Sequence, residues 1–346
     1  MNMAAVAREA GVSTMTVSRA LRHDPKVSPG LRLKIQEIAA RLGYRPNPLV
    51  SALMSQRRAG RHPTDQLKLG FITNFASRDG WREERLYREF YDGATRAAER
   101  QGYRLEEFWL REPGMTARRL SRILVTRNIH GVILAPLPDA EGRLELVWED
   151  LCAIAIGYSI SEPGLHRVSN HQFRSMAQLM PRLHELGYRR PGLALPQSLN
   201  DRVLRQWLAG FLVEQTSFED SRVPAFIKRD EEWMPEPFEN WLDAYEPDVV
   251  IGLQKQLIDW VQASGRRIPE DIGVALLDCP APNDRLSGIY QNGPEVGAAA
   301  ADALIAMLHQ NERGLSGFPR TVLISGSWVP GATLRAQVPA RKAGLL

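Results

Sequence analysis

The spacing of hydrophobic positions divides the chain into a short helical head and a longer body of alternating strands and helices. In the first 46 residues, apolar side chains recur every three or four positions in three short runs, as in small amphipathic helices. From Leu67 onward, short continuous apolar runs alternate with longer runs of helical spacing. This alternation predicts parallel sheets of the doubly wound type, with helices packed on both faces.

Local signals set the bounds of the three expected head helices. The first ends at Gly11, and Ser13 can cap a second helix over Thr14–Leu21. Pro29 begins a third helix, which Gly43 ends. Two helices joined by a tight glycine-containing turn, with a third that closes their core, form the helix-turn-helix pattern.

The second helix of such a unit enters the DNA major groove by its first residues. Its outward side offers Thr14, Met15, Ser18 and Arg19. This mixture of side chains can contact base edges, a thymine methyl group and phosphates. The pattern therefore predicts a DNA-binding head.

The body is expected to contain two similar passes of alternating strands and helices, at about 67–165 and 166–290. Two α/β subdomains with a cleft between them follow from this repetition, with a C-terminal crossover at 291–335. The expected strands are Leu67–Thr73, Tyr103–Leu110, Gly131–Pro136, Cys152–Gly157, Gly192–Leu195, Ala225–Lys228, Asp248–Leu253, Gly273–Asp278 and Thr321–Trp328. The expected helices are 87–101, 116–127, 172–187, 202–215, 255–264 and 294–310. Trp233 and Trp241 flank two prolines in a segment that is either a surface excursion or part of a dimer face.

Residues 47–54 form an unusually apolar connection between head and body. Asn47 and Pro48 fit the cap and first position of a helix, and Leu49, Val50 and Leu53 follow. A helix this short does not hold its structure alone in water. A partner explains its apolar residues better than a core does.

Charge is distributed unevenly along the chain. The formal net charge is +4, yet residues 1–62 carry 11 Lys or Arg against 3 Asp or Glu, so the remainder is mildly acidic. A basic head on an acidic body favours a small polyanion-binding module joined to a second function. A solvated basic surface would give the same charge count.

Several classes of protein are disfavoured. Two cysteines cannot build a disulfide framework or a four-ligand zinc site, and they fit a reducing cytoplasm. The sequence has no apolar run of membrane-spanning length and no apolar signal core near Met1. Nucleophile-elbow and phosphate-loop motifs are absent as well, so neither an enzyme nor a cofactor or metal is expected.

The head resembles the DNA-binding head of LacI/GalR-family transcription regulators. The similar positions run in order over some 55 residues, and they comprise 6–13, 16–21 and 42–47. Weaker similarity continues through the body at 98–103, 131–136, 185–190, 209–211 and 268–272, and at Gln291, Glu295 and Gly297. The resemblance implies a helix-turn-helix domain at 1–46, a hinge helix and linker at 47–64, and an effector-binding and dimerisation domain at 65–346 of the type I periplasmic-binding-protein fold.

The resemblance also implies roles for residues of the head and hinge. Thr14, Met15 and Arg19 match base-reading positions, whereas Ser18, Tyr44 and Asn47 match positions that touch or organise the phosphate backbone. Arg22 is either a backbone contact or a solvated side chain. Val50 and Leu53 belong to the hinge helix, and Leu53 matches a leucine that wedges into the minor groove and kinks DNA. Paired hinge helices imply a homodimer on a pseudo-palindromic operator.

The presumed effector cleft departs from the family pattern. Trp207 stands where an arginine is usual, Gln254 and Lys255 replace an Asn-Asp pair, and Asp278 is retained. The candidate effector-binding residues are Phe75, Trp81, Arg82, Tyr158, Arg205, Trp207, Gln254 and Asp278. Their aromatic members could stack on a sugar or an aromatic ligand. Alternatively, Trp207 and Phe75 plug a degenerate pocket.

These inferences predict a cytoplasmic, sequence-specific DNA-binding transcriptional regulator. We expect a repressor that acts as a homodimer on double-stranded operator DNA and responds to a small-molecule effector, with a sugar as one candidate. Two alternatives stay open: a two-lobed small-molecule binding protein, and a regulator with a degenerate pocket that senses no sugar.

Overall fold

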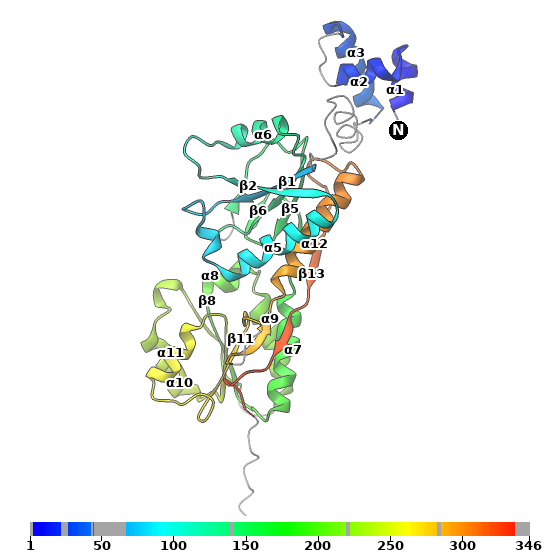
Figure 1. Cartoon of the computed structure of the whole chain (residues 1–346). Helices are drawn as coiled ribbons and strands as arrows, with labels where there is room; N and C mark the ends of the chain where they lie inside the picture. Colours follow the sequence, from blue (N-terminus) through cyan, green and yellow to red (C-terminus); the bar gives the residue numbers. More distant parts are fainter. Residues whose placement is uncertain are drawn as a thin grey trace, which may run out of the picture.

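The computed structural model describes residues 3–21, 27–42, 44, 67–138, 142–218, 222–281 and 285–335. A small helical head and two α/β subdomains make up the described part of the chain (Figure 1). The expected fold class, a helical head followed by two doubly wound α/β subdomains, is confirmed. The hinge segment expected at 47–54 lies outside the described residues.

Three helices form the head: α1 (Met3–Ala10), α2 (Thr14–Leu21) and α3 (Pro29–Arg41). Their core is apolar, and Val6, Val17 and Ile35 are fully buried in it. Ser13 Oγ accepts a hydrogen bond from the Thr16 backbone N–H at 3.2 Å, which is the expected cap of α2. The positive φ of Gly11, +70°, allows the tight turn between α1 and α2.

The first subdomain is built on a six-stranded sheet whose strands all run parallel. Its strand order is β13-β7-β5-β3-β1-β2. The strands are β1 (Leu67–Thr73), β2 (Tyr103–Trp109), β3 (Gly131–Leu134), β5 (Cys152–Ile156), β7 (His166–Asn170) and β13 (Thr321–Ile324). Helices α5 (Arg85–Arg100) and α12 (Gly293–His309) cover one face, and α6 (Ala117–Thr126) covers the other. The short turn η1 (Gly80–Arg82) and a two-stranded sheet of β4 (Gly142–Arg143) and β6 (Ile160–Glu162) complete this subdomain.

Helices α5 and α12 pack unusually closely. A Cβ atom placed on Gly297 would lie 1.9 Å from the Phe90 carbonyl oxygen, and one placed on Gly93 would lie 1.9 Å from the Pro294 carbonyl oxygen. Only glycine permits this approach of the two backbones.

The second subdomain has a six-stranded sheet of order β14-β12-β11-β10-β8-β9, in which only β14 is antiparallel to its neighbour. The strands are β8 (Pro191–Pro196), β9 (Phe226–Lys228), β10 (Val249–Gly252), β11 (Gly273–Leu276), β12 (Ser287–Tyr290) and β14 (Ser327–Val329). Helices α7 (Gln172–Glu185) and α9 (Gln206–Glu214) cover one face, and α10 (Pro235–Tyr245) and α11 (Gln256–Ala263) cover the other. Helix α8 (Gln197–Arg202) and the short turns η2 (Gln215–Ser217) and η3 (Asp230–Glu232) lie between these elements.

Four details differ from the expectations. The segment His166–Asn170 is a strand of the first sheet, although residue 166 was expected to open the second subdomain. The single strand expected at 321–328 is two strands, because β13 joins the first sheet and β14 the second. The helix expected at 202–215 is broken, since Leu204 and Arg205 adopt left-handed backbone conformations. The chain thus crosses between subdomains near residues 171, 291 and 325.

The fourth difference concerns the tryptophan-flanked segment, which holds helix α10. Trp241 is only 6% exposed and packs between Phe226 and Phe238, with ring centroids 5.6 and 5.7 Å away. Trp241 is therefore a core residue, whereas Met234 and Glu236 of the same segment are exposed, and the dimer-face interpretation of the segment stays a prediction. Among the described residues, no helix combines the length and apolar character that crossing a membrane requires.

Candidate functional site

The start of helix α2 presents an exposed face above the head core. Thr14 is exposed and Met15 is 57% exposed, whereas Val17 and Ala20 on the opposite side are buried. Ser18 and Arg19 are half-buried one turn later on α2. Pairing of Arg41 on α3 with Glu9 on α1 ties the supporting helices together. The helix-turn-helix geometry expected for this surface is thus present.

Of the other DNA-binding candidates, the structure describes only Tyr44. Its side chain packs against the head core, and burial raises the pKa of its phenol. Its backbone N–H donates to the Ala39 carbonyl oxygen at 2.8 Å, so the residue is held to the end of α3. Arg22, Asn47, Val50 and Leu53 lie outside the described residues.

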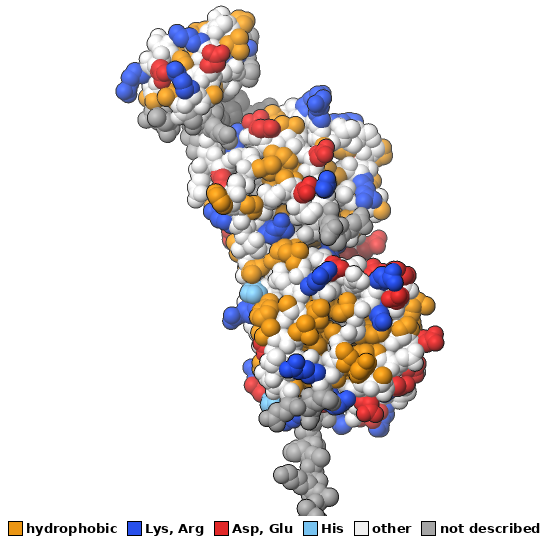
Figure 2. Space-filling model, turned by 180° about the vertical axis from the view of Figure 1, so that it is seen from behind, with side chains coloured by type: hydrophobic (Ala, Val, Ile, Leu, Met, Phe, Trp, Pro, Cys, Tyr) orange, Lys and Arg blue, Asp and Glu red, His pale blue; other side chains and the backbone are white. Residues whose placement is uncertain are grey.

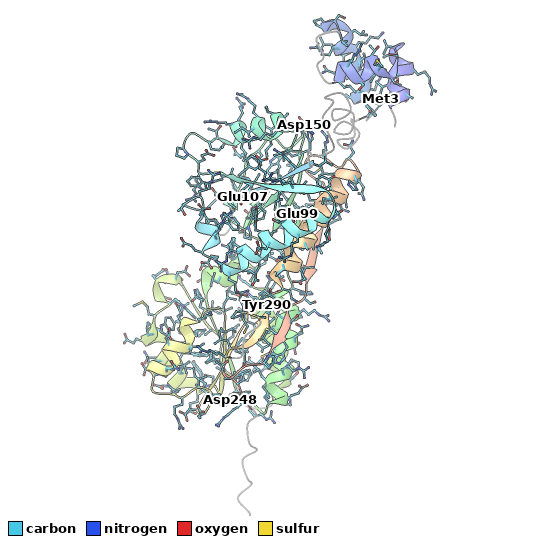
Figure 3. All side chains as sticks on the ribbon, viewed as in Figure 1. Met3, Glu99, Glu107, Asp150, Asp248 and Tyr290 are labelled. Atoms are coloured by element: carbon cyan, nitrogen blue, oxygen red, sulfur yellow. The ribbon has the colours of Figure 1, made fainter. Side chains whose placement is uncertain are left out.

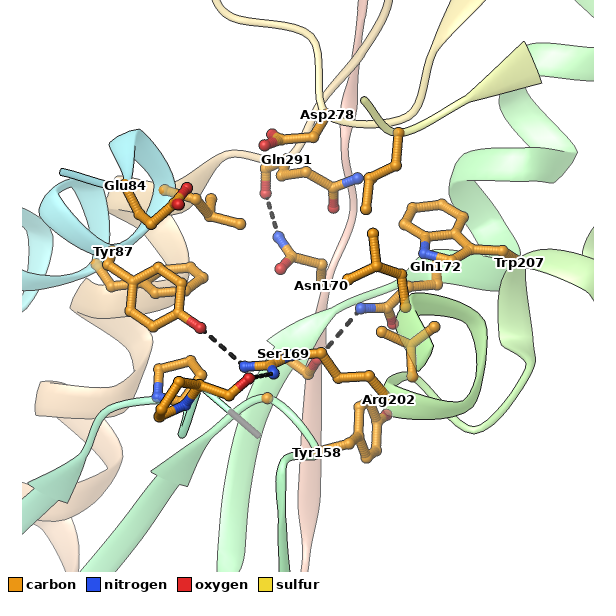
Figure 4. Close-up of a pocket in the computed structure, with 18 of the residues that line it drawn as sticks. Glu84, Tyr87, Tyr158, Ser169, Asn170, Gln172, Arg202, Trp207, Asp278 and Gln291 are labelled. Atoms are coloured by element: carbon orange, nitrogen blue, oxygen red, sulfur yellow. Dashed lines mark hydrogen bonds between the residues drawn. The ribbon is translucent and has the colours of Figure 1, made fainter. Parts of the chain in front are cut away.

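A cavity of about 480 Å³ lies where the two subdomains meet. It forms at the carboxyl ends of the parallel strands, where ligands of open α/β sheets bind. Its lining residues come from both subdomains and include Phe75, Glu84, Tyr87, Pro138, Tyr158, Ser169, Asn170, Gln172, Arg202, Trp207, Gln254, Asp278 and Gln291 (Figure 4). Because this space remains open beside Phe75 and Trp207, those two rings do not plug the cleft.

Five of the eight effector candidates line this cavity: Phe75, Tyr158, Trp207, Gln254 and Asp278. The Trp207 indole is 3% exposed and also packs in the core of the second subdomain, so it forms part of a fixed wall. The Gln254 amide is held in place, because its Oε1 accepts hydrogen bonds from Trp233 Nε1 at 3.0 Å and Gln256 Nε2 at 2.9 Å.

Trp81 and Arg82 do not line the cavity, and both assignments are wrong. Trp81 is 2% exposed, and its ring centroid lies 5.8 Å from that of Phe71 and 5.0 Å from that of Tyr91 in the core of the first subdomain. Arg82 stacks over the Trp81 ring at 4.1 Å and pairs with Glu107 at 2.6 Å. Both residues belong to the short turn η1 in the connection between β1 and α5, where Trp81 packs against Tyr91 of α5 and Arg82 pairs with Glu107 of β2.

Arg205 is also not part of the cavity. It sits at the left-handed residue before α9, and its Nε donates to Asp201 Oδ1 at 2.7 Å on the surface. Arg202, one turn earlier, lines the cavity in its place. The break at Leu204 and Arg205 lets Arg202 line the cavity while Arg205 stays on the surface. The continuous helix expected at 202–215 did not predict this difference.

Arg202 joins the two subdomains. From helix α8 of the second subdomain, its Nη1 donates to the Pro138 carbonyl oxygen at 2.7 Å. Its Nη2 donates to the Tyr87 hydroxyl at 2.8 Å and also to the Leu137 carbonyl oxygen. These three acceptors belong to the first subdomain and are uncharged.

A second bridge spans the cleft at Asp278. Arg85 on α5 donates to Asp278 Oδ1 at 2.5 Å and to Glu89 Oε1 at 2.6 Å. Burial raises the pKa of the Asp278 carboxyl, and the negative charges of Glu89 and Glu84 raise it further, whereas Arg85 acts to lower it. Tyr290 lies at the same junction (Figure 3), where burial and the charge of Glu89 raise its pKa to about 12.

Buried amides at the strand ends complete the cavity. Asn170 Nδ2 donates to the Gln291 carbonyl oxygen at 2.5 Å, and Gln291 Nε2 donates to the Leu277 carbonyl oxygen. Asn170 ends β7 and Gln291 directly follows β12. Neither residue was among the predicted effector-binding residues, although their place at the carboxyl ends of strands was a usable signal.

Metal ligation has no support in the described ranges, where no group of three His, Cys, Asp or Glu side chains is placed to hold an ion. His166 has a structural role instead. Its Nε2 lies 2.8 Å from Glu312 Oε1, and its Nδ1 accepts a hydrogen bond from the Arg320 backbone N–H at 2.9 Å.

Known families match both parts of the chain. Residues 2–47 match the family described as "Bacterial regulatory proteins, lacI family". Residues 181–334 match the family described as "Periplasmic binding protein-like domain".

Curated relatives agree with the match of the head. The chain is 50% identical over 52 residues to Catabolite control protein A of Priestia megaterium, which is 15% of this chain and 16% of that protein. It is 49% identical over 51 residues to the HTH-type transcriptional regulator GalS of Salmonella typhimurium, 15% of each protein. A longer match, 27% identical over 202 residues, covers 58% of this chain and 55% of the HTH-type transcriptional regulator PtxS of Pseudomonas plecoglossicida. The first relatives are thus matched over about a sixth of their length.

Solved structures share the fold over nearly the whole chain. The structure of the lac repressor dimer bound to operator and the anti-inducer ONPF is 19% identical and has a TM-score of 0.55, with 97% of this chain and 99% of that one covered. The structure of the transcriptional regulator CelR in complex with cellobiose is also 19% identical, with a TM-score of 0.54 and coverages of 96% and 99%. The chain thus has a helix-turn-helix head of the lacI family and a periplasmic-binding-protein-like body, and it shares the fold of the lac repressor over nearly its whole length.

Proposed function

We propose that this protein is a sequence-specific transcriptional repressor that binds a pseudo-palindromic operator as a homodimer. A small molecule in the cleft raises or lowers its affinity for the operator. LacI-family regulators act by binding, so no catalytic residue is assigned. The observation that carries the proposal is the exposed start of α2, which stands above a buried core in a head that matches the family from end to end.

Within the head, we assign base reading to Thr14, Met15 and Arg19. Thr14 and Met15 lie exposed in the first turn of α2, where a recognition helix meets base edges in the major groove, and Arg19 follows one turn later, half-buried. Ser18 and Tyr44 are assigned to the phosphate backbone, together with Arg22 and Asn47. Phosphate contacts add affinity, whereas base contacts decide the sequence.

For the hinge, we assign Val50 and Leu53 to the minor groove at the operator centre. A Leu53→Ala variant is expected to lose operator affinity and DNA bending, because an apolar wedge kinks DNA by unstacking one base step. Unchanged affinity and bending of the operator would show that the hinge assignment is wrong.

The homodimer has support from the surface of the body. Figure 2 shows hydrophobic side chains gathered on one side of the second subdomain. In and just before α9 of this subdomain, Leu204, Leu212 and Val213 are exposed apolar residues. Contiguous exposed apolar surface marks interaction sites. Sedimentation equilibrium of the full chain is expected to give the mass of two chains, and a monomer mass at micromolar concentration would contradict the dimer.

The cleft is assigned to the effector. The two subdomains meet there through Arg202 and the Arg85–Asp278 pair, so a ligand between them can change their relative angle. For the effector to change DNA binding, it must bind two conformations of the body, which differ in the angle between the subdomains, with different affinity.

Selection from random double-stranded DNA tests the proposal as a whole. The full chain is expected to enrich one motif with two inverted half-sites, because a two-fold symmetric dimer binds a two-fold symmetric site. Enrichment of no motif, or of one asymmetric half-site, would contradict it. A reporter gene behind the selected operator then fixes the sign of regulation, with lower expression expected when the chain is present.

A further inference from the structure

The cleft wall around Asp278 carries more negative than positive charge. Asp278 and Glu89 share one cation, Arg85, at 2.5 and 2.6 Å, and Glu84 contributes a third carboxylate to the same wall. The charges of Glu84 and Glu89 both act on Asp278. Two carboxylates therefore share the Arg85 guanidinium, and Glu84, which lines the open cavity together with Asp278, adds a third negative charge that acts on Asp278.

Arg202 is the one Lys or Arg among the described residues that line the cavity; uncharged oxygens take its donors, and its charge lies on the wall opposite Asp278. Arg202 donates to Pro138, Leu137 and Tyr87 of the first subdomain. Arg167 does not line this cavity, since its guanidinium lies 5.3 Å from the Tyr158 ring centroid and donates to the Gly157 and Ile160 carbonyl oxygens at 3.1 and 3.2 Å. Figure 4 shows Arg202 on the side of the cavity away from Asp278, with the Tyr87 ring between Arg202 and Glu84. The Asp278 wall thus keeps its negative character.

An unpaired buried acceptor points in the same direction. Gln291 is 2% exposed, and its Nε2 donates to the Leu277 carbonyl oxygen. This bond fixes the amide orientation, since only the NH₂ group can donate. Within the part of the chain that the structure describes, Gln291 Oε1 has no hydrogen-bond partner, and it is buried in the cavity wall beside Asp278 (Figure 4). A buried acceptor without a donor costs free energy until a ligand supplies one.

Aromatic rings form much of the remaining cavity wall. Phe75, Tyr87, Tyr158 and Trp207 all line the cavity. The faces of such rings attract cations through their quadrupole, and the attraction grows when water is excluded. A cavity of about 480 Å³ is large enough for a small ligand with one polar head and one ring.

We propose that the cleft binds an effector that carries a protonated primary amino group, held by Asp278, Glu84 and Gln291 Oε1. This inference rests on the proposed function, because it names the chemical class of the effector. An ammonium group offsets the excess negative charge and donates up to three hydrogen bonds. A neutral hydroxyl group supplies donors but no charge, a quaternary ammonium supplies charge but no donors, and a carboxylate meets like charge at this wall.

Matched probes test the amine on the full-length chain. D-Glucosamine, D-glucose and N-acetyl-D-glucosamine differ only at one carbon, and tyramine and 4-(2-hydroxyethyl)phenol differ only in the amine. We expect the ammonium member of at least one set to raise the midpoint of thermal unfolding. In titration calorimetry, we expect it to bind about tenfold more tightly than its neutral partner. The inference is overturned if no amine raises the midpoint, or if the neutral partner binds as tightly.

Variants of the wall locate the effect. Glu84→Gln and Asp278→Asn are expected to remove the tenfold preference for the amine. Glu83→Gln is the matched control, since Glu83 is an exposed neighbour of the same charge that does not line the cavity. If Glu84→Gln keeps the full preference, the assignment to this wall is wrong. Operator selection is read separately: intact operator binding without amine binding overturns this inference alone, and amine binding without operator binding overturns the proposed function alone.

Discussion

The two partners of the Arg85–Asp278 bridge are expected to respond unequally to removal. The side chains of Arg85 and Asp278 are 28% and 25% exposed, so the pair is largely but not fully buried. Burial and the charges of Glu89 and Glu84 raise the pKa of Asp278 despite Arg85, which means that the surroundings favour the neutral carboxyl. Asparagine copies the shape of that neutral form.

The magnitudes follow from the charges left behind. Asp278→Asn removes one of three carboxylates and leaves Arg85 paired with Glu89, so we expect the free energy of unfolding at pH 7 to change by no more than about 1 kcal/mol. Arg85→Met removes the guanidinium that pairs with Asp278 and Glu89, and it leaves these two carboxylates without their shared cation while the charge of Glu84 still acts on Asp278. Breaking a buried pair in this way costs about 3 to 5 kcal/mol, and partial exposure reduces the expected cost to about 2 to 3 kcal/mol.

Urea unfolding of the full chain, followed by tryptophan fluorescence at pH 7, measures both changes. Arg182→Met is the matched control, because Arg182 forms an exposed ion pair with Glu185 on α7 away from the cleft. Its effect is expected to stay below about 1 kcal/mol. An equal loss of unfolding free energy in Arg85→Met and Asp278→Asn, or a larger loss in Asp278→Asn, would refute the excess of negative charge at this wall.

Further outcomes follow from other parts of the structure. Because the folded state raises the pKa of Asp278, the wild-type chain loses stability relative to Asp278→Asn as pH rises from about 4 through the folded pKa, and urea midpoints at several pH values measure this trend. Gly297→Ala forces a Cβ against the Phe90 carbonyl oxygen and should lower the free energy of unfolding by about 3 kcal/mol. Gly30→Ala in α3, where the added Cβ meets no other group within 4 Å, should raise it by up to about 1 kcal/mol. Thermal unfolding compares the two variants. Trp241→Ala should cost about 3 to 5 kcal/mol in urea unfolding because it empties a core position, and a loss below 1 kcal/mol would place Trp241 outside the core.

Periodicity and motif order were sufficient to predict the architecture. The head helices begin and end where glycine, serine and proline predicted, because these residues act through local backbone preferences. Assignment of strands to sheets was less predictable. β7 and β13 pair in the first sheet although about 150 residues separate them, and that pairing depends on long-range packing.

The cleft was only partly predictable for the same reason. Phe75, Tyr158 and Asp278 each lie two residues beyond the end of a strand, so their place at the sheet edge could be inferred. Trp81 could not be separated from them, because its burial depends on the fold of the η1 turn against Phe71 and Tyr91. Arg202 was missed because two left-handed residues end its helix, and no turn residue such as glycine marks that break in the sequence.

Base-resolved operator binding by Arg19→Ala tests the central claim most directly. Affinities of the wild type and the variant are measured by fluorescence anisotropy on the selected operator and on each single base-pair substitution of it, at fixed salt, with Lys34→Ala as the charge-matched control on exposed α3. We predict that Arg19→Ala loses about 1 to 3 kcal/mol on the operator and no longer discriminates one base pair in each half-site, whereas Lys34→Ala keeps the full pattern of discrimination. Uniform weakening by Arg19→Ala across all sequences would contradict the claim that α2 reads the operator through this residue.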